Sequence, residues 1–200
     1  MTPITDIAAL EALYGVPGAP AVFKVATRLT PEYRRWITAS RFCVLTTVGP
    51  GGTDGSPRGD DGPVVAVRDA QTLLMPDWRG NNRLDSLRNI VADGRVSLMF
   101  MVPGSTSVVR VNGTAALTAD ADVLAGFDQK GIAPRSVIVI AIGEVYIQCA
   151  RALMRSRLWT SGDESAGLPT TGQIFSAMKD GFDGQEYDAA WPDHAKKSMW

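Results

Sequence analysis

Residues 136–148 read SVIVIAIGEVYIQ, and the run VIVIAI within them, residues 137–142, is apolar at every position. A strand with one face in water alternates apolar and polar side chains, whereas this run offers no polar side chain to either face. We therefore expect a strand that is buried on both faces, as in a closed barrel or beneath a dimer interface. The run is much shorter than the ~20 apolar residues that a membrane span needs.

Strand-like segments also fill the middle of the chain before this run. They are rich in β-branched and apolar residues, and turn-forming stretches separate them. The expected strands are FCVLTTV (42–48), PVVAVRD (63–69), TLLMPD (72–77), RVSLMFMV (95–102) and SVVRVNGTAAL (107–117). The glycines of GPGGTDG (49–55) are typical of a long turn. With residues 136–148, these segments predict a mainly β (α+β) fold, a six-stranded antiparallel barrel with flanking helices.

Helices are expected on both sides of the barrel in sequence and between its strands. They cover residues 6–14, 31–39, about 83–92, 120–127 and 172–180. Thr30 and Pro31 are a favourable N-cap and first helical residue for the second of these helices. A chain of 200 residues fits a single domain. We divide it into an N-terminal helical segment (1–40), the barrel (41–150) and a C-terminal tail of helix and loop (151–200).

The composition narrows the classes of partner and compartment. Hydrophobic residues make up 45% of the chain and charged residues 20%, and the net charge is -1, so no basic field for nucleic acid is present. No signal peptide or membrane span is recognisable, and Cys43 and Cys149 are expected to be buried, reduced thiols. We expect a cytoplasmic protein whose partners are small molecules or copies of itself.

Residues 75–90, MPDWRGNNRLDSLRNI, form a corner between a strand and a helix. If Asn82 is the N-cap, Asp85 is the third helical residue, as in a variant of the capping box. Arg83 and Ser86 then face the helix mouth, because the apolar stripe of the helix takes the positions of Leu84, Leu87, Ile90 and Val91.

The same corner concentrates groups that bind anions. Free backbone N–H groups and the helix dipole favour an anion at the helix mouth. Arg79 and Arg83 flank that mouth with Asn81 and Asn82 between them, and a guanidinium matches phosphate oxygens in a bidentate way. The corner therefore predicts a phosphate site. The alternative from these residues alone is a well-capped surface helix with solvated arginines.

An ordered series of segments resembles the pyridoxamine 5'-phosphate oxidase-like flavoproteins, most closely a subgroup of uncharacterised bacterial members. The series is FCVLTTVGPGG, GSPRGD, TLLMPDWRGNNRLDSLRNI, GRVSLMFMVPG and VRVNGTA, continued by ARALMRSRLW, and it covers about residues 30–160. The resemblance implies a split β-barrel and a homodimer that binds FMN in a cleft between its subunits. The implied phosphate contacts are Arg79, Asn82 and Arg83, with Asn81 beside them.

The resemblance implies further cofactor-binding residues. Arg58 takes the position of a family arginine on the strand beside the flavin. The strand edge passes the flavin ring, largely with backbone groups, at Met75, Pro76 and Asp77. Arg151 and Arg155 are expected to reach the cofactor of the partner subunit, and Trp159 to cover it.

Two departures from the family pattern argue against vitamin B6 oxidation. The oxidases carry a lysine downstream of the arginine equivalent to Arg58, where this chain reads GDDGPV (59–64). They also end in an arginine and histidine motif, whereas His194 is the only histidine here and lies in an unrelated tail.

The expected function is that of an FMN-dependent oxidoreductase. It would move electrons through flavin N5 between a nicotinamide nucleotide or other donor and an unknown small-molecule acceptor. The alternatives are a flavin-binding carrier or sensor without turnover and a reductase that uses the deazaflavin F420. No catalytic side chain is assigned, and the spacing of Asp54, Asp60 and Asp61 fits no calcium loop, so no metal site is predicted.

Overall fold

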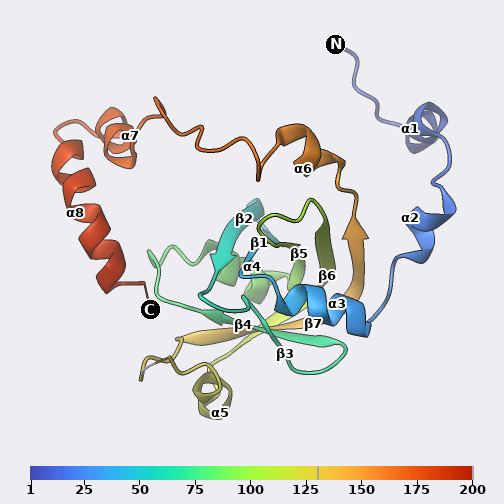
Figure 1. The fold of residues 1–200 in the computed structure, drawn as a ribbon, viewed down its shortest axis with the longest axis horizontal. Helices are drawn as coiled ribbons and strands as arrows, with labels where there is room; N and C mark the ends of the chain where they lie inside the picture. The colour runs from blue at the N-terminus through green and yellow to red at the C-terminus, as the bar shows by residue number, and fades with distance from the viewer. Residues whose placement is uncertain (130, 200) are drawn as a thin grey trace.

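A single antiparallel sheet, curled into a split barrel, forms the centre of the molecule (Figure 1). The structure is a computed structural model that describes residues 1–129 and 131–199. The strands are β1 (Phe42–Gly49), β2 (Gly52–Gly59), β3 (Ala66–Val67), β4 (Thr72–Asp77), β5 (Arg95–Met101), β6 (Val108–Thr118) and β7 (Ser136–Gln148). Their order is β2-β1-β5-β6-β7-β4-β3, so the barrel is open between the edge strands β2 and β3. The sheet has seven strands where the sequence predicted six.

The extra strand, β2, lies in the glycine-rich stretch that was expected to be a long turn. Gly49 pairs with Gly52, so the turn is short and β2 runs antiparallel to β1 as far as Gly59. Gly52 has a φ of 114°, a conformation that glycine adopts without steric cost. Hairpin pairing thus overrides a low strand propensity. The strand expected at 63–69 shrinks to β3, with Val64 and Val65 buried just before it.

The long strand β7 is buried mainly on one face. Ile138, Ile140 and Ile142 point into the core, whereas Val139 is half-buried and Ala141 is exposed. The expectation that both faces of 137–142 are buried is therefore wrong for Ala141 in the single chain. The core is formed by residues of β1, β4, β5, β6 and β7 and includes Leu45, Leu73, Leu98, Phe100, Val109, Val111, Ile138 and Ile140.

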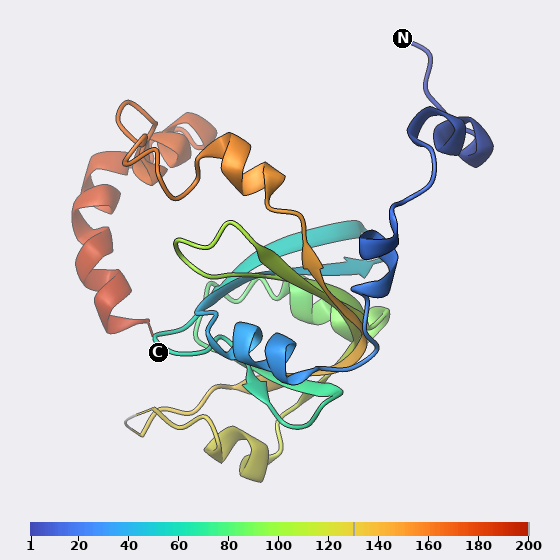
Figure 2. The same cartoon turned by 45° about the vertical axis from the view of Figure 1, so that its right-hand side comes forward.

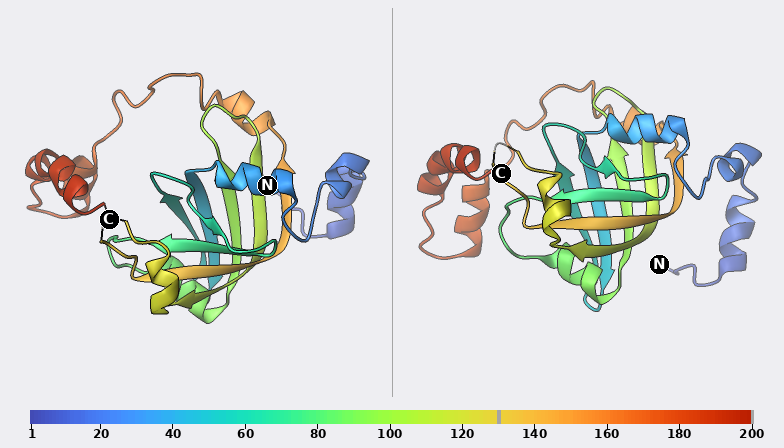
Figure 3. Two further views of the ribbon diagram at one scale, coloured as in Figure 1. Left: turned by 60° about the horizontal axis from the view of Figure 1, so that its bottom comes forward. Right: turned by 90° about the horizontal axis from the view of Figure 1, so that it is seen from below.

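Two helices close the ends of the barrel. The views in Figure 3 place α3 (Pro31–Thr38) and α4 (Asp85–Ala92) at opposite ends. Thr30 caps α3 as predicted, since its side chain accepts a hydrogen bond from the backbone N–H of Tyr33. Helix α4 packs against β1, β2 and β6. A further short helix, α5 (Ala121–Ala125), lies between β6 and β7 as expected.

The two ends of the chain extend from the barrel on opposite sides (Figure 2). The N-terminal helices are α1 (Ile7–Tyr14) and α2 (Ala19–Phe23), and the C-terminal ones are α6 (Arg151–Ser156), α7 (Thr171–Met178) and α8 (Gly184–Lys197). Helices α7 and α8 pack against each other. Residues 184–197, in the part of the tail where no helix was expected, are thus helical. Across residues 1–129 and 131–199, no helix combines the length and apolarity needed to span a membrane.

Candidate functional site

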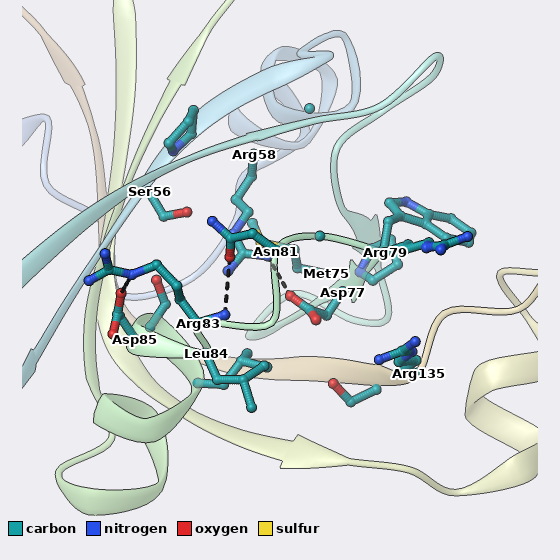
Figure 4. Close-up of a pocket in the computed structure, with 18 of the residues that line it drawn as sticks. Ser56, Arg58, Met75, Asp77, Arg79, Asn81, Arg83, Leu84, Asp85 and Arg135 are labelled. Atoms are coloured by element: carbon teal, nitrogen blue, oxygen red, sulfur yellow. Dashed lines mark hydrogen bonds and ion pairs between the residues drawn. The ribbon is translucent and has the colours of Figure 1, made fainter. Parts of the chain in front are cut away.

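A cavity of about 1130 Å³ lies at the split of the barrel, between β2 and the end of β4 (Figure 4). Residues 54–59 of β2 form one wall, and residues 75–77 of β4 with the following loop form another. The first turn of α4 and residues 135–136 at the start of β7 complete it. The cavity brings together these predicted cofactor residues: Arg58, Met75, Pro76, Asp77, Arg79, Asn81, Asn82 and Arg83.

An ion pair crosses the split. Nη1 of Arg58 on β2 donates to Oδ1 of Asp77 on β4 at 2.5 Å, and only 19% and 16% of the two side chains are exposed. β2 and β4 are not neighbours in the sheet, so the ion pair links strands that share no backbone hydrogen bonds. Nε of Arg58 is buried and has no acceptor among the described residues. Because a buried donor without a partner is costly, this atom is suited to an acceptor on a ligand.

The helix mouth differs from the predicted capping box. α4 begins at Asp85, and its N-cap is Leu84, whose left-handed backbone (φ 62°) brings no side-chain cap. Asn82 is also left-handed, with a φ of 59°, whereas an N-cap has an extended backbone. The Asn82 side chain instead accepts a hydrogen bond from Nη1 of Arg135 at 3.2 Å. The prediction that Asn82 caps the helix is wrong.

The uncapped mouth of α4 opens into the cavity. The first turn of a helix carries backbone N–H groups without intrahelical partners, and the helix dipole adds partial positive charge there. In α4 the N-cap Leu84 makes no side-chain cap hydrogen bond, none of the described side chains takes its place, and residues 84–87 line the cavity. An apolar N-cap thus leaves more hydrogen-bonding capacity for an anion than the predicted asparagine cap would have left.

Two side chains that were expected at the mouth are already paired. The Ser86 hydroxyl is buried and donates to Oδ2 of Asp54 on β2 at 2.6 Å. Nε of Arg83 donates to Oδ2 of Asp85 at 2.8 Å, with 75% of the Arg83 side chain exposed. The apolar stripe of α4 is also shorter than predicted. Ile90 is buried and Leu87 is half-buried, whereas Leu84 and Val91 are exposed.

The charges of the cavity are nearly balanced. Its lining includes four arginines, at positions 58, 79, 83 and 135, and five aspartates, at positions 54, 60, 61, 77 and 85. Arg79 is exposed and makes no hydrogen bond or ion pair with any residue that the structure describes. Asp60 accepts hydrogen bonds from Nε1 of Trp78 at 2.7 Å and Nε2 of Gln129 at 3.2 Å. Unpaired positive charge is thus concentrated at the loop after β4.

Arg135 is a cavity residue that sequence reasoning missed. It lies 53 residues from Asn82 in the chain and reaches it only because β7 runs beside β4. No local motif marks it. Figure 4 shows Arg79 and Arg135 on the same side of the cavity, with Arg83 and Asp85 on the other.

The thiol of Cys43 lies beneath the cavity wall. Cys43 pairs with Arg58 in the register of β1 and β2 and is fully buried. Burial raises the pKa of this thiol to about 12, and the nearby Arg58 guanidinium opposes that rise only in part. Cys43 is therefore a neutral core residue. Cys149 is exposed, so the prediction of two buried thiols is wrong for it.

The remaining predicted residues lie away from this cavity. Arg151 and Arg155 are exposed on α6, and Trp159 follows that helix, where its Nε1 donates to the Ser105 carbonyl at 2.8 Å. None of the three lines the cavity of its own chain. In residues 1–129 and 131–199, no group of three His, Cys, Asp or Glu side chains could hold a metal ion.

These features define a split-barrel protein with a cavity lined by arginines and aspartates at the split. The family described as "Pyridoxamine 5'-phosphate oxidase" matches residues 29–149 in sequence, and the chain belongs to that family. The resemblance seen in the sequence is confirmed, although the match ends before ARALMRSRLW (150–159). Helices α1 and α2 and the C-terminal helices lie outside the matched residues.

Solved structures share the barrel. A HupZ variant from Group A Streptococcus has 17% sequence identity and a TM-score of 0.50, covering 60% of this chain and 98% of its own. An FMN-binding protein from Syntrophomonas wolfei has 14% identity and a TM-score of 0.43 (58% and 88% covered). An F420 reductase has 17% identity and a TM-score of 0.43 (58% and 98% covered). These likenesses concern the fold alone. A comparison with curated protein sequences finds no significant match.

Proposed function

We propose that the cavity binds FMN and that the chain is an FMN-dependent oxidoreductase. The observation that carries this proposal is the uncapped N-terminus of α4, which opens into a cavity at the barrel split that Arg79 and Arg83 also line. A helix N-terminus and guanidinium groups together are a favourable site for a phosphate monoester. Membership of the family supports the flavin as the group that carries this phosphate.

The helix mouth supports one direction for the proposed cofactor. With the phosphate held by Arg79, Asn82 and Arg83, and Asn81 beside them, the ring system extends along β2 and β4. There Met75 and Pro76 are buried and form an apolar wall, and the unpaired Nε of Arg58 offers a hydrogen bond to an acceptor on the ring edge. When bound, FMN supplies hydride and electron transfer, and the protein supplies position and electrostatics.

The charge balance of the cavity favours FMN over F420. F420 carries a longer and more anionic tail, which requires additional basic residues along its path. The five aspartates of this cavity outnumber its four arginines, which suits a single phosphate at the corner better than a polyanionic tail. F420 is therefore the second candidate cofactor.

Mutation of Arg79 and Arg83 tests whether these arginines hold the phosphate. Charge-assisted hydrogen bonds contribute about 1.5–3 kcal/mol each, so Arg79→Ala with Arg83→Ala should weaken FMN binding by roughly a hundredfold or more. Arg88→Ala is the matched control, because Arg88 is exposed on α4 and does not line the cavity. Dissociation constants from flavin fluorescence titrations provide the comparison. Equal affinity for FMN in the unmodified protein, the double variant and the control would refute the assignment of Arg79 and Arg83 to the phosphate.

Turnover distinguishes an enzyme from a carrier or sensor. We propose a nicotinamide nucleotide or another small molecule as the electron donor and a small molecule as the acceptor. NADH or NADPH added anaerobically should bleach the flavin absorbance of the loaded protein. Failure of every donor tested to reduce the flavin, with FMN still bound, would favour the flavin-binding carrier or sensor.

A homodimer is part of the proposal. Arg151, Arg155 and Trp159 do not line the cavity of their own chain, so they would contribute to the cofactor site only from a partner subunit. Dilution that dissociates the dimer should then release flavin, as measured by sedimentation with absorbance detection at flavin wavelengths. A monomer that retains flavin would contradict a shared site.

A further inference from the structure

The Arg58–Asp77 ion pair lies on the wall along which the ring of the proposed flavin extends. We propose that Asp77 holds the reduction potential of that flavin low by neutralising Arg58. The inference rests on the proposed function and adds a role that flavin binding does not require. Asp77 neither gains nor loses an electron or a proton in this role, so it is a positioning and tuning residue.

The geometry gives Asp77 close control over the charge of Arg58. Its Oδ1 lies 2.5 Å from Nη1, and both side chains are largely shielded from water, with 16% and 19% exposed. Charges with little contact with water interact more strongly than exposed ones because solvent screens them less. Asp77 is on β4, where its partner in the sheet is Ser136 of β7. Paired strands therefore hold the carboxylate in place.

The ion pair occupies one nitrogen of the Arg58 guanidinium and leaves the other two without an acceptor among the described residues. Nη1 of Arg58 is taken by Asp77, whereas Nε is buried without an acceptor among the described residues. A ligand thus meets a hydrogen-bond donor whose positive charge is balanced by the adjacent carboxylate. An arginine without such a partner would offer the same donor with its full charge.

This difference matters because reduction changes the charge of a flavin ring. At neutral pH, two electrons and one proton from an external reductant convert the oxidised ring to a reduced ring with one additional negative charge. An unbalanced guanidinium stabilises the reduced ring more than the oxidised one and so raises the potential. The Asp77 carboxylate opposes that stabilisation, so the intact pair favours a strongly reducing flavin.

The other carboxylates of the cavity are less suited to this role. Asp85 pairs with Arg83 at the helix mouth, where 47% of the Asp85 side chain and 75% of the Arg83 side chain are exposed. Asp60 is held by Trp78 and Gln129. Asp93 offers a matched control, since it is an aspartate in an ion pair with Arg95 and does not line the cavity.

The test measures the reduction potential of bound FMN, with dithionite as reductant and a reference dye, in the unmodified protein, Asp77→Asn and Asp93→Asn. Asp77→Asn should raise the potential by about 30 mV or more, equivalent to a tenfold change in the ratio of affinities for reduced and oxidised FMN. Asp93→Asn should leave the potential unchanged, because its ion pair lies outside the cavity. A potential that is unchanged or lower in Asp77→Asn would overturn the inference.

A second variant keeps the test decisive if Asp77→Asn does not fold. Arg58→Gln removes the guanidinium and should give a lower potential than the unmodified protein; an equal or higher potential would overturn the inference.

If Asp77→Asn lowers only the melting temperature and leaves the potential unchanged, the ion pair is only a structural link across the split. If the unmodified protein binds no FMN, the proposed function and this inference both fail. Binding with an unchanged potential defeats the inference alone.

Discussion

Cys43 and Arg58 face each other across β1 and β2, with their side chains on the same face of the hairpin. One is a fully buried neutral thiol and the other a half-buried cation that reaches Asp77. Within this one residue pair, β1 contributes a core residue and β2 contributes a residue of the cavity wall. Arg58 thus extends from a strand whose opposite residue is buried in the core.

The raised pKa of Cys43 predicts a pH dependence of stability. The folded protein keeps the thiol proton up to about 12, whereas the unfolded chain releases it near the ordinary value of 9.0. Stability from this group is intact below pH 9 and should fall by up to about 1.4 kcal/mol per pH unit above it. Denaturant unfolding of the protein and of Cys43→Ala at pH 8 to 11 should show their difference in unfolding free energy shrinking as pH rises. A constant difference would contradict the assignment.

Individual cavity residues were predictable, but their pairings were not. Arg79 and Arg83 were singled out from the corner sequence and Arg58 from the family resemblance, and all three line the cavity. Their roles in binding a cofactor stay predictions. The Arg58–Asp77 pair joins residues 19 apart in the chain, and no local pattern predicts a contact across a barrel split. Arg135 was missed for the same reason, because its place depends on the pairing of β7 with β4.

At the scale of elements, the errors in prediction occur where pairing outweighs propensity. β2 contains three glycines and a proline between residues 52 and 59, which is a poor strand sequence in isolation. It becomes a strand because β1 supplies a hydrogen-bonding partner along its whole length. In α4 the boundary moved by two residues because left-handed Asn82 and Leu84 delay the start of the helix. The long apolar strands, by contrast, were predictable from composition.

The β6–β7 pair depends on a glycine at its bulge. The register shifts between Asn112 and Gly113, and a Cβ at Gly113 would lie 2.0 Å from the Ala141 carbonyl oxygen on β7. Because backbone must move to relieve this clash, Gly113→Ala should lower the free energy of unfolding by about 1–3 kcal/mol. Gly55→Ala is the control, since a Cβ there meets no atom within 4 Å. Urea unfolding curves would measure the free energy of unfolding. An equal loss in Gly113→Ala and Gly55→Ala would contradict the requirement for glycine at the bulge.

At the scale of the whole molecule, a family barrel carries extensions at both ends. The match to the family covers residues 29–149, and the α7–α8 hairpin beyond it is held by its own contacts. Phe175, Phe182, Tyr187 and Trp191 pack ring against ring, and Asp188 accepts a hydrogen bond from the Gly172 N–H at 2.8 Å. We propose that the barrel is the folding unit of the chain and that this hairpin is an appendage.

Truncation tests this organisation. Ending the chain after residue 159 removes α7 and α8 but keeps α6 and Trp159. Because the hairpin packs mainly on itself, the truncated protein should melt within about 2 °C of the full chain, which corresponds to no more than about 1 kcal/mol for a domain of this size. Differential scanning calorimetry provides the measurement. A large fall in melting temperature would show that the hairpin supports the barrel.

The absorption spectrum of the purified protein, followed by mass identification of the molecule that acid releases, tests the central claim most directly. We predict the two-banded visible spectrum of a flavin and a released mass equal to that of FMN. A released F420 would retain the cavity and replace the cofactor. A colourless protein that also fails to bind added FMN would contradict the account, and the corner after β4 would then be a solvated turn before an uncapped helix.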